Sequence, residues 1–392
     1  MQDAYIVAGY RTAVAKSKRG KLRFYRPDDL AITVIQSLLA SVPTLDPKRV
    51  DDVIVGNAVP EAEQGLQVGR IIASRAVGIH APGVTVNRYC ASGLETIAMA
   101  TAKIRSGFAD CIIAGGTESM TMVPQAGWKT VPAYSIASDE PDYYLNMGLT
   151  AEAVAKEFEV SREDQDRFSY DSHQKAIRAI QNGYFKSGIL PLNIEEVYVD
   201  EKGRRQRRSF TLDTDEGPRA DTSLEALAKL KPVFAAGGCI TAGNSSQTSD
   251  GAAFVIVMGE KMVKELGIKP IARLVACAVA GVHPRIMGIG PVEAVPKALK
   301  QAGMNLGDID LVELNEAFAS QAIAVIRRLG IDPAIVNSNG GAIALGHPLG
   351  CTGCKLTVQI IHDLDRLKKK YGIVTACVGG GQGIAGIIEK LN

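Results

Sequence analysis

The sequence Val84-Thr85-Val86-Asn87-Arg88-Tyr89-Cys90-Ala91-Ser92-Gly93 connects a short run of β-branched residues to a helical pattern that ends at Arg105. Residues 84–86 are typical of a strand, and residues 92–105 are typical of a helix. The stretch therefore predicts a strand, a tight turn and a helix. Cys90 lies in the turn, followed by three small residues that would let a ligand approach the backbone closely.

Strands and helices alternate on both sides of this unit, and the same order occurs again in the second half of the chain. Repeated βα units predict mostly parallel sheets that are covered by helices on both faces. We predict first-half strands at 5–8, 53–55, 84–86 and 111–114, with helices at 28–42, 68–77 and 92–105. We predict second-half strands at 272–279, 311–314, 335–336 and 374–378, with helices at 292–302, 317–329 and 354–367.

Landmark residues repeat together with the elements, which predicts two pseudo-symmetric halves. Val86-Asn87 corresponds to Val336-Asn337, and Ala114-Gly115-Gly116 corresponds to Val378-Gly379-Gly380. The segment between the halves breaks the pattern with turn-rich stretches, a helix over 161–182 and a hairpin around Lys202-Gly203. We expect a strand at 253–258 to rejoin the first sheet. The predicted division is 1–118 with 249–269, then 119–248 as a loop domain, then 270–392.

The composition is that of an ordinary globular protein, with 46% hydrophobic and 22% charged residues among 392. A net charge of +2 argues against nucleic acid as the main partner. No apolar run is long enough to span a membrane, and the first residues leave no room for a signal peptide. Seven cysteines, several within apolar runs, indicate reduced thiols and a cytoplasmic location.

Two thiols and one imidazole lie in glycine-rich settings that suit thioester exchange. Cys90 at a helix N-terminus is a candidate nucleophile, although a buried cysteine filling the corner is the alternative. His347 is a candidate base, and Cys377 is a second thiol whose lowered or poised pKa would serve proton exchange. The N–H groups at Gly379 and Gly380 would bind an oxyanion. Asn315, at a strand end, would orient a water or a carbonyl, or would simply cap a helix.

Three other motifs carry weaker signals. Gly381–Gly386 matches a dinucleotide fingerprint, but too few residues follow it to complete a nucleotide-binding unit. Cys351 and Cys354 have metal or redox spacing without a second pair, so we expect no metal there. The basic run Lys202–Arg208 is typical of a solvated hairpin tip, and the alternative is a segment that attracts an anionic cofactor.

Taken together, these segments resemble the thiolase family along the whole chain. The matching motifs are Val86–Leu94, Asn315–Ala319, Gly340–Gly353 and Cys377–Gly383. The resemblance implies an α/β, thiolase-like fold with two βαβαβαββ halves, each containing a mixed five-stranded sheet in a layered body. It further implies that the loop domain covers the active site and binds coenzyme A as substrate, with no permanently bound cofactor.

The resemblance also implies residue roles. Cys90 would attack the 3-keto carbon of a 3-ketoacyl-CoA, and Cys377 would protonate the departing acetyl-CoA enolate. His347 would activate Cys90 and then the incoming coenzyme A, and with a water on Asn315 it would hold the enolate oxygen. The N–H groups of Cys90 and Gly379 would hold the tetrahedral oxyanion. The implied coenzyme A and acyl contacts are Ser246, Ala242, Arg219, Met147 and Phe318.

Within this family, Arg88-Tyr89 and the segment Tyr144–Gly148 look more like degradative 3-ketoacyl-CoA thiolases. Short-chain acetoacetyl-CoA enzymes typically carry a His where this chain has Asn146. We therefore predict thiolytic cleavage in fatty-acid β-oxidation, with acetoacetyl-CoA synthesis as the alternative. The same residues leave room for a decarboxylating ketoacyl synthase, a non-catalytic acyl-CoA-binding subunit or, least of all, an NAD-dependent dehydrogenase. We expect a homodimer or homotetramer, and a partner subunit of a β-oxidation complex is compatible with the resemblance.

Overall fold

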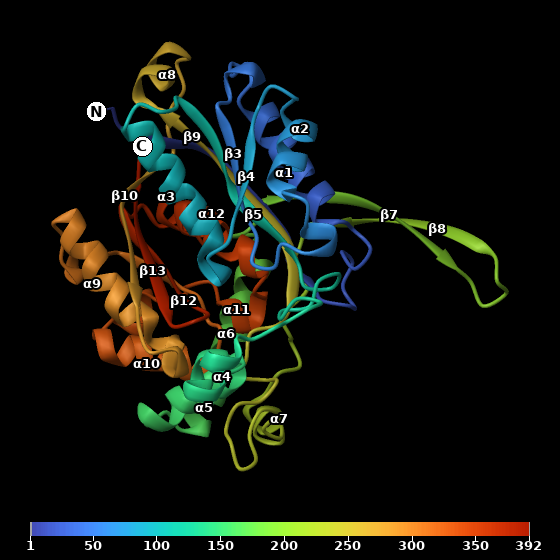
Figure 1. Cartoon of the computed structure of the whole chain (residues 1–392), viewed down its shortest axis with the longest axis vertical. Helices are drawn as coiled ribbons and strands as arrows, with labels where there is room; N and C mark the ends of the chain where they lie inside the picture. The colour runs from blue at the N-terminus through green and yellow to red at the C-terminus, as the bar shows by residue number, and fades with distance from the viewer. Residues whose placement is uncertain (1, 392) are drawn as a thin grey trace.

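The computed structural model describes residues 2–391, which form alternating layers of helix and sheet (Figure 1). Helices α3 (Ser92–Arg105) and α12 (Leu349–Leu367) form the central layer, and both contact strands. One continuous core combines their apolar residues with those of strands from both halves. Helices α1 (Pro27–Ser41) and α2 (Val68–Ala76) cover the outer face of the first half. Their counterparts on the second half are α9 (Gly290–Ala302) and α10 (Ala319–Leu329).

The strands form one mixed path made of two parts. The first part has the order β4-β3-β5-β9-β1, and the second has the order β10-β13-β12-β11. The two parts join through antiparallel pairing at Ile6 and Ala272. The first-half strands are β1 (Ala4–Thr12), β3 (Asp52–Gly56), β4 (Gly83–Val86), β5 (Cys111–Ser119) and β9 (Ser249–Gly259). The second-half strands are β10 (Ala272–Gly281), β11 (Leu311–Leu314), β12 (Tyr371–Val378) and β13 (Gln382–Lys390).

The remaining elements are short or belong to the segment between the halves. The helices are α4 (Tyr134–Asp139), α5 (Met147–Glu157), α6 (Arg162–Gln181), α7 (Leu224–Ala228), α8 (Glu260–Glu265) and α11 (Ala342–Leu345). The strands are β2 (Ala15–Lys16), β6 (Ile189–Leu190), β7 (Leu192–Val199) and β8 (Arg205–Leu212). None of the helices formed by residues 2–391 has both the length and the apolar character that a bilayer crossing requires.

Most of the predicted elements are confirmed, including the layered α/β fold. Helix α3 and strand β11 begin and end where the sequence predicted. Helix α6 begins after Ser161, whose hydroxyl caps it by accepting from the Asp164 N–H at 3.0 Å. Strand β9 returns to the first sheet between β1 and β5. The three-part division of the chain stays a prediction.

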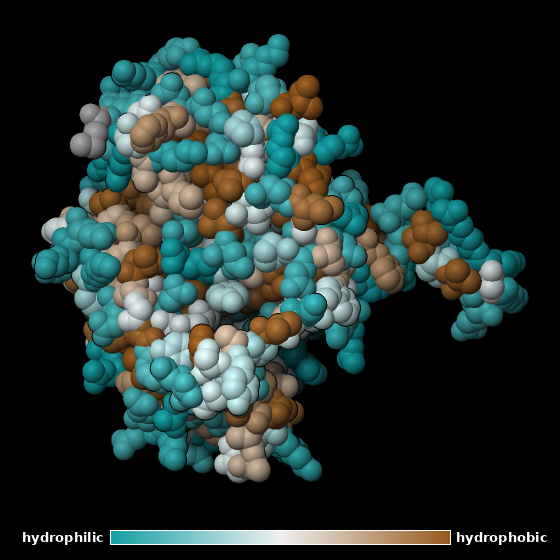
Figure 2. Space-filling view, in the orientation of Figure 1, coloured by the Kyte–Doolittle hydropathy of each residue, from teal (hydrophilic) through white to brown (hydrophobic). Residues whose placement is uncertain are grey.

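The hairpin of β7 and β8 projects from the body (Figure 1), and it carries the basic run. Its visible surface is mainly hydrophilic with a few apolar residues (Figure 2). Arg207 and Arg208 pair with Glu195 and Glu196 on the facing strand. The basic residues are therefore partly neutralised by acidic residues across the hairpin.

Two local predictions differ from the structure, and a third segment agrees with the rejection of the dinucleotide motif. Residues 335–336 form no strand, because Asp332 and Pro333 start a 3-10 turn that leaves only a single parallel bridge between Val312 and Val336. Helix α12 begins at Leu349, five residues before the predicted start. The fingerprint-like segment at 381–386 enters strand β13, where a nucleotide-binding fingerprint would open a helix.

Two glycines explain the early start of α12. A Cβ at Gly93 on α3 would lie 2.7 Å from the Cys354 N, and a Cβ at Gly353 on α12 would lie 2.3 Å from the Leu94 N. The two helices thus cross with their backbones in close contact, and this approach requires residues without side chains. The tertiary contact outweighs the low helix propensity of glycine that the sequence suggested. The crossing also places the N-terminal ends of both helices near each other.

We expect Gly353→Ala to lower the free energy of unfolding by about 1–3 kcal/mol, because the added methyl group must push two packed backbones apart. Urea unfolding followed by circular dichroism would measure the loss. Gly307→Ala is the matched control, since a Cβ at Gly307 would meet nothing within 4 Å. Equal stability of the two variants would contradict the close-contact argument.

Candidate active site

Cys90 sits in a one-turn 3-10 helix (Tyr89–Ala91) between β4 and α3. Tyr89 holds a φ of 42°, a left-handed conformation that is uncommon for a residue with a side chain. Local hydrogen bonds hold this turn. The Tyr89 N–H donates to the Asn87 Oδ1 at 2.8 Å, and the Ser92 hydroxyl donates to the Tyr89 carbonyl at 2.7 Å. The turn thus fixes the position of the thiol at the start of α3.

The Cys90 thiol is buried, with 6% of the residue exposed. Burial raises its pKa to about 12, and the N–H groups of Gly379 and of Cys90 itself oppose that rise. These are the two N–H groups that the sequence analysis assigned to an oxyanion. The carboxylate of Glu118 raises the thiol pKa further. Before substrate binds, the site therefore holds a neutral thiol beside two backbone donors.

His347 lies just before α12, and both of its ring nitrogens have partners. Nδ1 lies 2.6 Å from the Thr352 Oγ1, and that hydroxyl also donates to the Pro348 carbonyl at 2.9 Å. Because the hydroxyl hydrogen is used there, Thr352 accepts from Nδ1–H, and Nε2 is left with its lone pair. Burial and the nearby Lys355 lower the His347 pKa to about 3. The ring is thus a neutral base whose Nε2 is available.

Asn315 and Cys377 reach this point from the second half of the sheet. The Asn315 Nδ2 lies 3.3 Å from the His347 Nε2, and its Oδ1 has no hydrogen-bond partner among residues 2–391. Cys377 is buried on β12, and burial together with the charge of Cys90 raises its pKa well above the usual value. The predicted lowered or poised thiol pKa is therefore wrong for the substrate-free site, because desolvation dominates.

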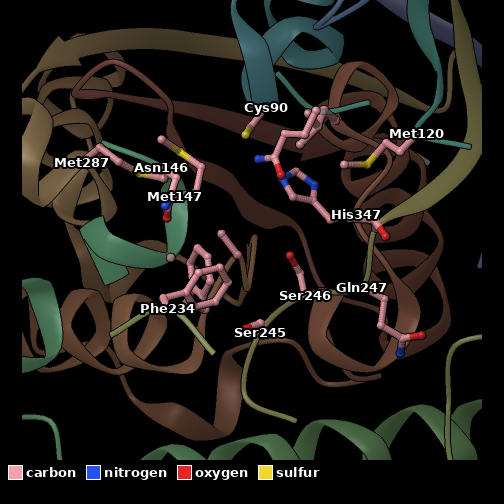
Figure 3. Close-up of a pocket in the computed structure, with 16 residues that line it drawn as sticks. Cys90, Met120, Asn146, Met147, Phe234, Ser245, Ser246, Gln247, Met287 and His347 are labelled. Carbon is pink, nitrogen blue, oxygen red and sulfur yellow. The ribbon is translucent and has the colours of Figure 1, made fainter. Parts of the chain in front are cut away.

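A cavity of about 180 Å³ opens in front of Cys90 and His347 (Figure 3). Predicted residues Met147, Phe318 and Ser246 also line it. Asn315 and Gly379 reach it through their hydrogen bonds with His347 and Cys90, and Cys377 packs in one apolar cluster with the lining residues. Its other lining residues are Met120, Gln125, Asn146, Gly148, Phe234, Ser245, Gln247, Thr248, Met287, Ala317 and Leu349. The wall is mostly apolar, with thioethers and aromatic rings facing the thiol.

A second cavity, of about 430 Å³, shares Gln247 with the first. Arg219 and Ala242, both predicted from the sequence, line it together with Lys16 and Arg19. Arg219 pairs with Asp221 at its rim, at 3.1 Å. The apolar cavity at Cys90 is therefore adjacent, at Gln247, to a cavity lined by cationic side chains.

The geometry agrees with two family models. The N-terminal thiolase domain matches residues 4–261, and the C-terminal thiolase domain matches residues 268–390. The chain belongs to the thiolase family. It is 50% identical to a 3-ketoacyl-CoA thiolase of Bacillus subtilis over 99% of this chain and 100% of that protein.

Two further relatives are named acetyl-CoA acetyltransferases. An acetyl-CoA acetyltransferase of Pseudomonas aeruginosa is 43% identical, with 98% of each chain covered. The crystal structure of an acetyl-CoA acetyltransferase from Bacillus anthracis matches with a TM-score of 0.89 at 38% identity, covering 100% of this chain and 99% of the other. The protein is thus a thiolase-family acyltransferase, and its role within the family is a separate question.

Sequence reasoning missed three residues that organise this site. Thr352 holds the His347 Nδ1, Gln247 lines both cavities, and Glu118 lies close enough to Cys90 to affect its pKa. Glu118 gave a usable signal, since a carboxylate within an otherwise apolar and glycine-rich strand needs buried partners. Thr352 lies only five residues after His347, so this pairing was within reach of the sequence, whereas Gln247 gave no signal because the cavities it lines are built from distant segments.

We expect Thr352→Val to slow acylation of Cys90 about tenfold or more, because Nδ1–H loses its acceptor and the ring is no longer held with Nε2 as the base. Rapid-quench measurement with labelled acetyl-CoA would give this rate. Thr352→Ser keeps the hydroxyl and should restore most of it. If Ser and Val behaved alike, the hydroxyl would not be the orienting group.

Proposed function

We propose that this protein is a 3-ketoacyl-CoA thiolase, which cleaves a 3-ketoacyl-CoA with coenzyme A to acetyl-CoA and a shortened acyl-CoA. The observation that carries the proposal is the meeting of Cys90, His347, Asn315, Cys377 and the Gly379 N–H around one cavity. A thiol nucleophile, a base, an acid and oxyanion donors are the groups that this reaction needs.

In the first half-reaction the Cys90 proton moves to the His347 Nε2 and the sulfur attacks the 3-keto carbon. The N–H groups of Cys90 and Gly379 donate to the resulting oxyanion and stabilise its charge. The bond between C2 and C3 then breaks, and the Cys377 thiol protonates C2 to release acetyl-CoA. Protonated His347, together with a water on the Asn315 Oδ1, would hold the enolate oxygen during this step.

In the second half-reaction the proton on His347 passes to the Cys377 thiolate, so that both groups return to their starting state. Coenzyme A then loses its thiol proton to the His347 Nε2 and attacks the acyl carbon on Cys90. The Cys90 thiolate leaves and recovers a proton from His347. Each enzyme group thus regains its starting protonation state, and the net proton that C2 of acetyl-CoA gains is balanced by the proton that the coenzyme A thiol loses.

The lining of the first cavity supports an acyl chain longer than acetyl. Met120, Met147 and Met287 lie around the space beyond Cys90, and flexible thioethers adapt to chains of different length (Figure 3). The relative named 3-ketoacyl-CoA thiolase shares half of its residues with this chain. We therefore place the reaction in fatty-acid β-oxidation. Acetoacetyl-CoA synthesis is the second candidate, favoured by the relatives named acetyl-CoA acetyltransferase.

The adjacent cavities support coenzyme A as the thiol substrate. The pantetheine arm would pass Ser246 and Gln247, and the phosphates would meet Lys16, Arg19 and Arg219. Burial, Arg219 and Lys16 together lower the pKa of His173 in this cavity to about 4, which reflects a positive environment. The cationic side chains of the second cavity suit the phosphates of coenzyme A, and the first cavity would place its reactive sulfur at Cys90.

Thiolysis rates for 3-ketoacyl-CoA substrates of four to sixteen carbons test the proposed substrate class. We expect kcat/KM to rise beyond four carbons, because the apolar wall adds contacts to each further methylene group. The rate of acetyl-CoA condensation, measured with the same enzyme, is the control. A maximum at four carbons with no activity on longer chains would favour the acetoacetyl-CoA enzyme.

We expect Lys16→Ala to raise the KM for coenzyme A about threefold to tenfold with little change in kcat, because one phosphate contact is lost. With pantetheine, which lacks the nucleotide, the same variant should match the wild type. Lys18→Ala is the matched control, since Lys18 lies two residues away and does not line the cavity. An equal loss with pantetheine would place the defect elsewhere than at the phosphates.

A further inference from the structure

Glu118, at the end of strand β5, is buried with 1% exposure and accepts hydrogen bonds from four N–H groups. Its Oε2 accepts from the Ala58 N at 2.8 Å and from the Gly350 N at 2.8 Å. Its Oε1 accepts from the Gln64 Nε2 at 2.7 Å and the Asn57 Nδ2 at 3.2 Å. One carboxylate thus joins three segments that are distant in the sequence.

The two backbone partners of Oε2 belong to segments that both pack near the nucleophile. Ala58 and Leu349 belong to the apolar cluster that surrounds Cys90, and Gly350 follows Leu349 in the first turn of α12. His347 lies two residues before Leu349, the first residue of α12. The carboxylate therefore connects the backbone of the half that carries Cys90 to the helix that carries His347.

We propose that Glu118 is a positioning residue for acyl transfer, which sets the separation of Cys90 from His347 by joining Ala58 to the first turn of α12. This inference rests on the proposed roles of Cys90 and His347. Glu118 makes no contact with the substrate in this scheme. It acts through Cys90 and His347, which do contact the substrate.

Only the ionised carboxylate can fill this role. All four partners are donors, so a protonated Glu118 would bring a fifth hydrogen to a group of N–H donors and would lose at least one bond. The titratable groups that its charge reaches are the thiols of Cys90 and Cys351. Its hydrogen-bond partners are all uncharged, so no cation among them offsets the charge.

The neighbouring amides cannot adapt to a neutral replacement without losing other bonds. The Gln64 Oε1 accepts from the Ser119 N at 2.6 Å, and its Nε2 also donates to the Val59 carbonyl at 2.8 Å. A flip of Gln64 would break both. Glu118→Gln therefore brings an NH2 group against fixed donors, and either the Ala58–Gly350 connection or the bond to Gln64 is lost.

The pH dependence of the rate follows from the same contacts. Burial raises the Glu118 pKa to about 6, while the backbone and side-chain hydrogen bonds oppose the rise. The set of four hydrogen bonds is therefore complete above pH 6 and is lost as the pH falls through that value. Since a raised pKa means that the folded protein takes up this proton more readily than the unfolded chain does, acid does not weaken the fold through Glu118. His347, with a pKa of about 3, does not titrate in this range.

The experiment measures acetylation of Cys90 by labelled acetyl-CoA from pH 5 to 8 in the wild type and in Glu118→Gln. We expect the wild-type rate to fall below about pH 6 while the protein stays folded. We expect Glu118→Gln to be slower by about tenfold or more at pH 7.5, with no such acid limb and with a KM for coenzyme A within about twofold of the wild type. A melting temperature well above the assay temperature would show that the variant is folded, because the lost hydrogen bonds are partly offset by removal of a buried charge.

Asp363→Asn is the matched control. Asp363 is a buried carboxylate on α12, the helix that contains Gly350, and burial also raises its pKa. It lies about 20 Å from Gly350 along the helix axis. It should keep the wild-type rate and pH profile. An equal loss in both variants would show a general effect of the helix and would overturn the inference.

Further outcomes separate the inference from the proposed function. If wild-type Cys90 takes no label, the proposed function fails. If the wild type is labelled and Glu118→Gln is labelled at the same rate with the same profile, only the positioning role fails. If Glu118→Gln does not fold, the wild-type profile still decides, and a rate that stays constant from pH 8 to pH 5 overturns the role.

Discussion

The site depends on the crossing of α3 and α12 in the central layer. Each helix begins at a reactive group, Cys90 for α3 and His347 for α12, and the two axes meet at Gly93 and Gly353. A side chain at either glycine would separate the backbones, and the two N-terminal ends would move apart with them. The sheets on both sides enclose this crossing in one apolar core. The chemistry is thus fixed by a packing contact that lies away from the reacting atoms.

Burial also decides the resting state of the site. It raises the pKa of Cys90 to about 12 and lowers the pKa of His347 to about 3, so the neutral pair is favoured before substrate binds. A thiolate formed there would lack a stabilising partner apart from two backbone N–H groups. A substrate carbonyl changes this balance, because the charge leaves sulfur for an oxygen held by those donors. We infer that proton transfer and attack occur together, which protects the thiol between turnovers.

Local signals were sufficient for much of the fold and for naming the candidate site residues. The predicted bounds of α3 and β11 hold because periodicity and flanking residues determine them locally. The start of α12 could not be predicted, since Gly350 and Gly353 read as loop residues until α3 is placed against them. The partners of Glu118 were hidden, because a hydrogen bond across the fold leaves no trace in spacing, whereas the pairing of Thr352 with His347 is local and was overlooked. The pKa of Cys377 was mispredicted because the extent of its burial is not a property of the local sequence.

The duplication of the chain explains why the two halves contribute different chemistry from the same scaffold. Asn57 follows β3 and Asn315 follows β11, at corresponding points of the two halves. In the first half the side-chain amide of Asn57 donates a hydrogen bond to the Glu118 carboxylate. In the second half the side-chain amide of Asn315 faces His347. The proposed nucleophile and positioning carboxylate thus belong to one copy, and the proposed base and acid thiol belong to the other. Each copy could then lose the function that the other retained, and as a result neither half holds a complete site.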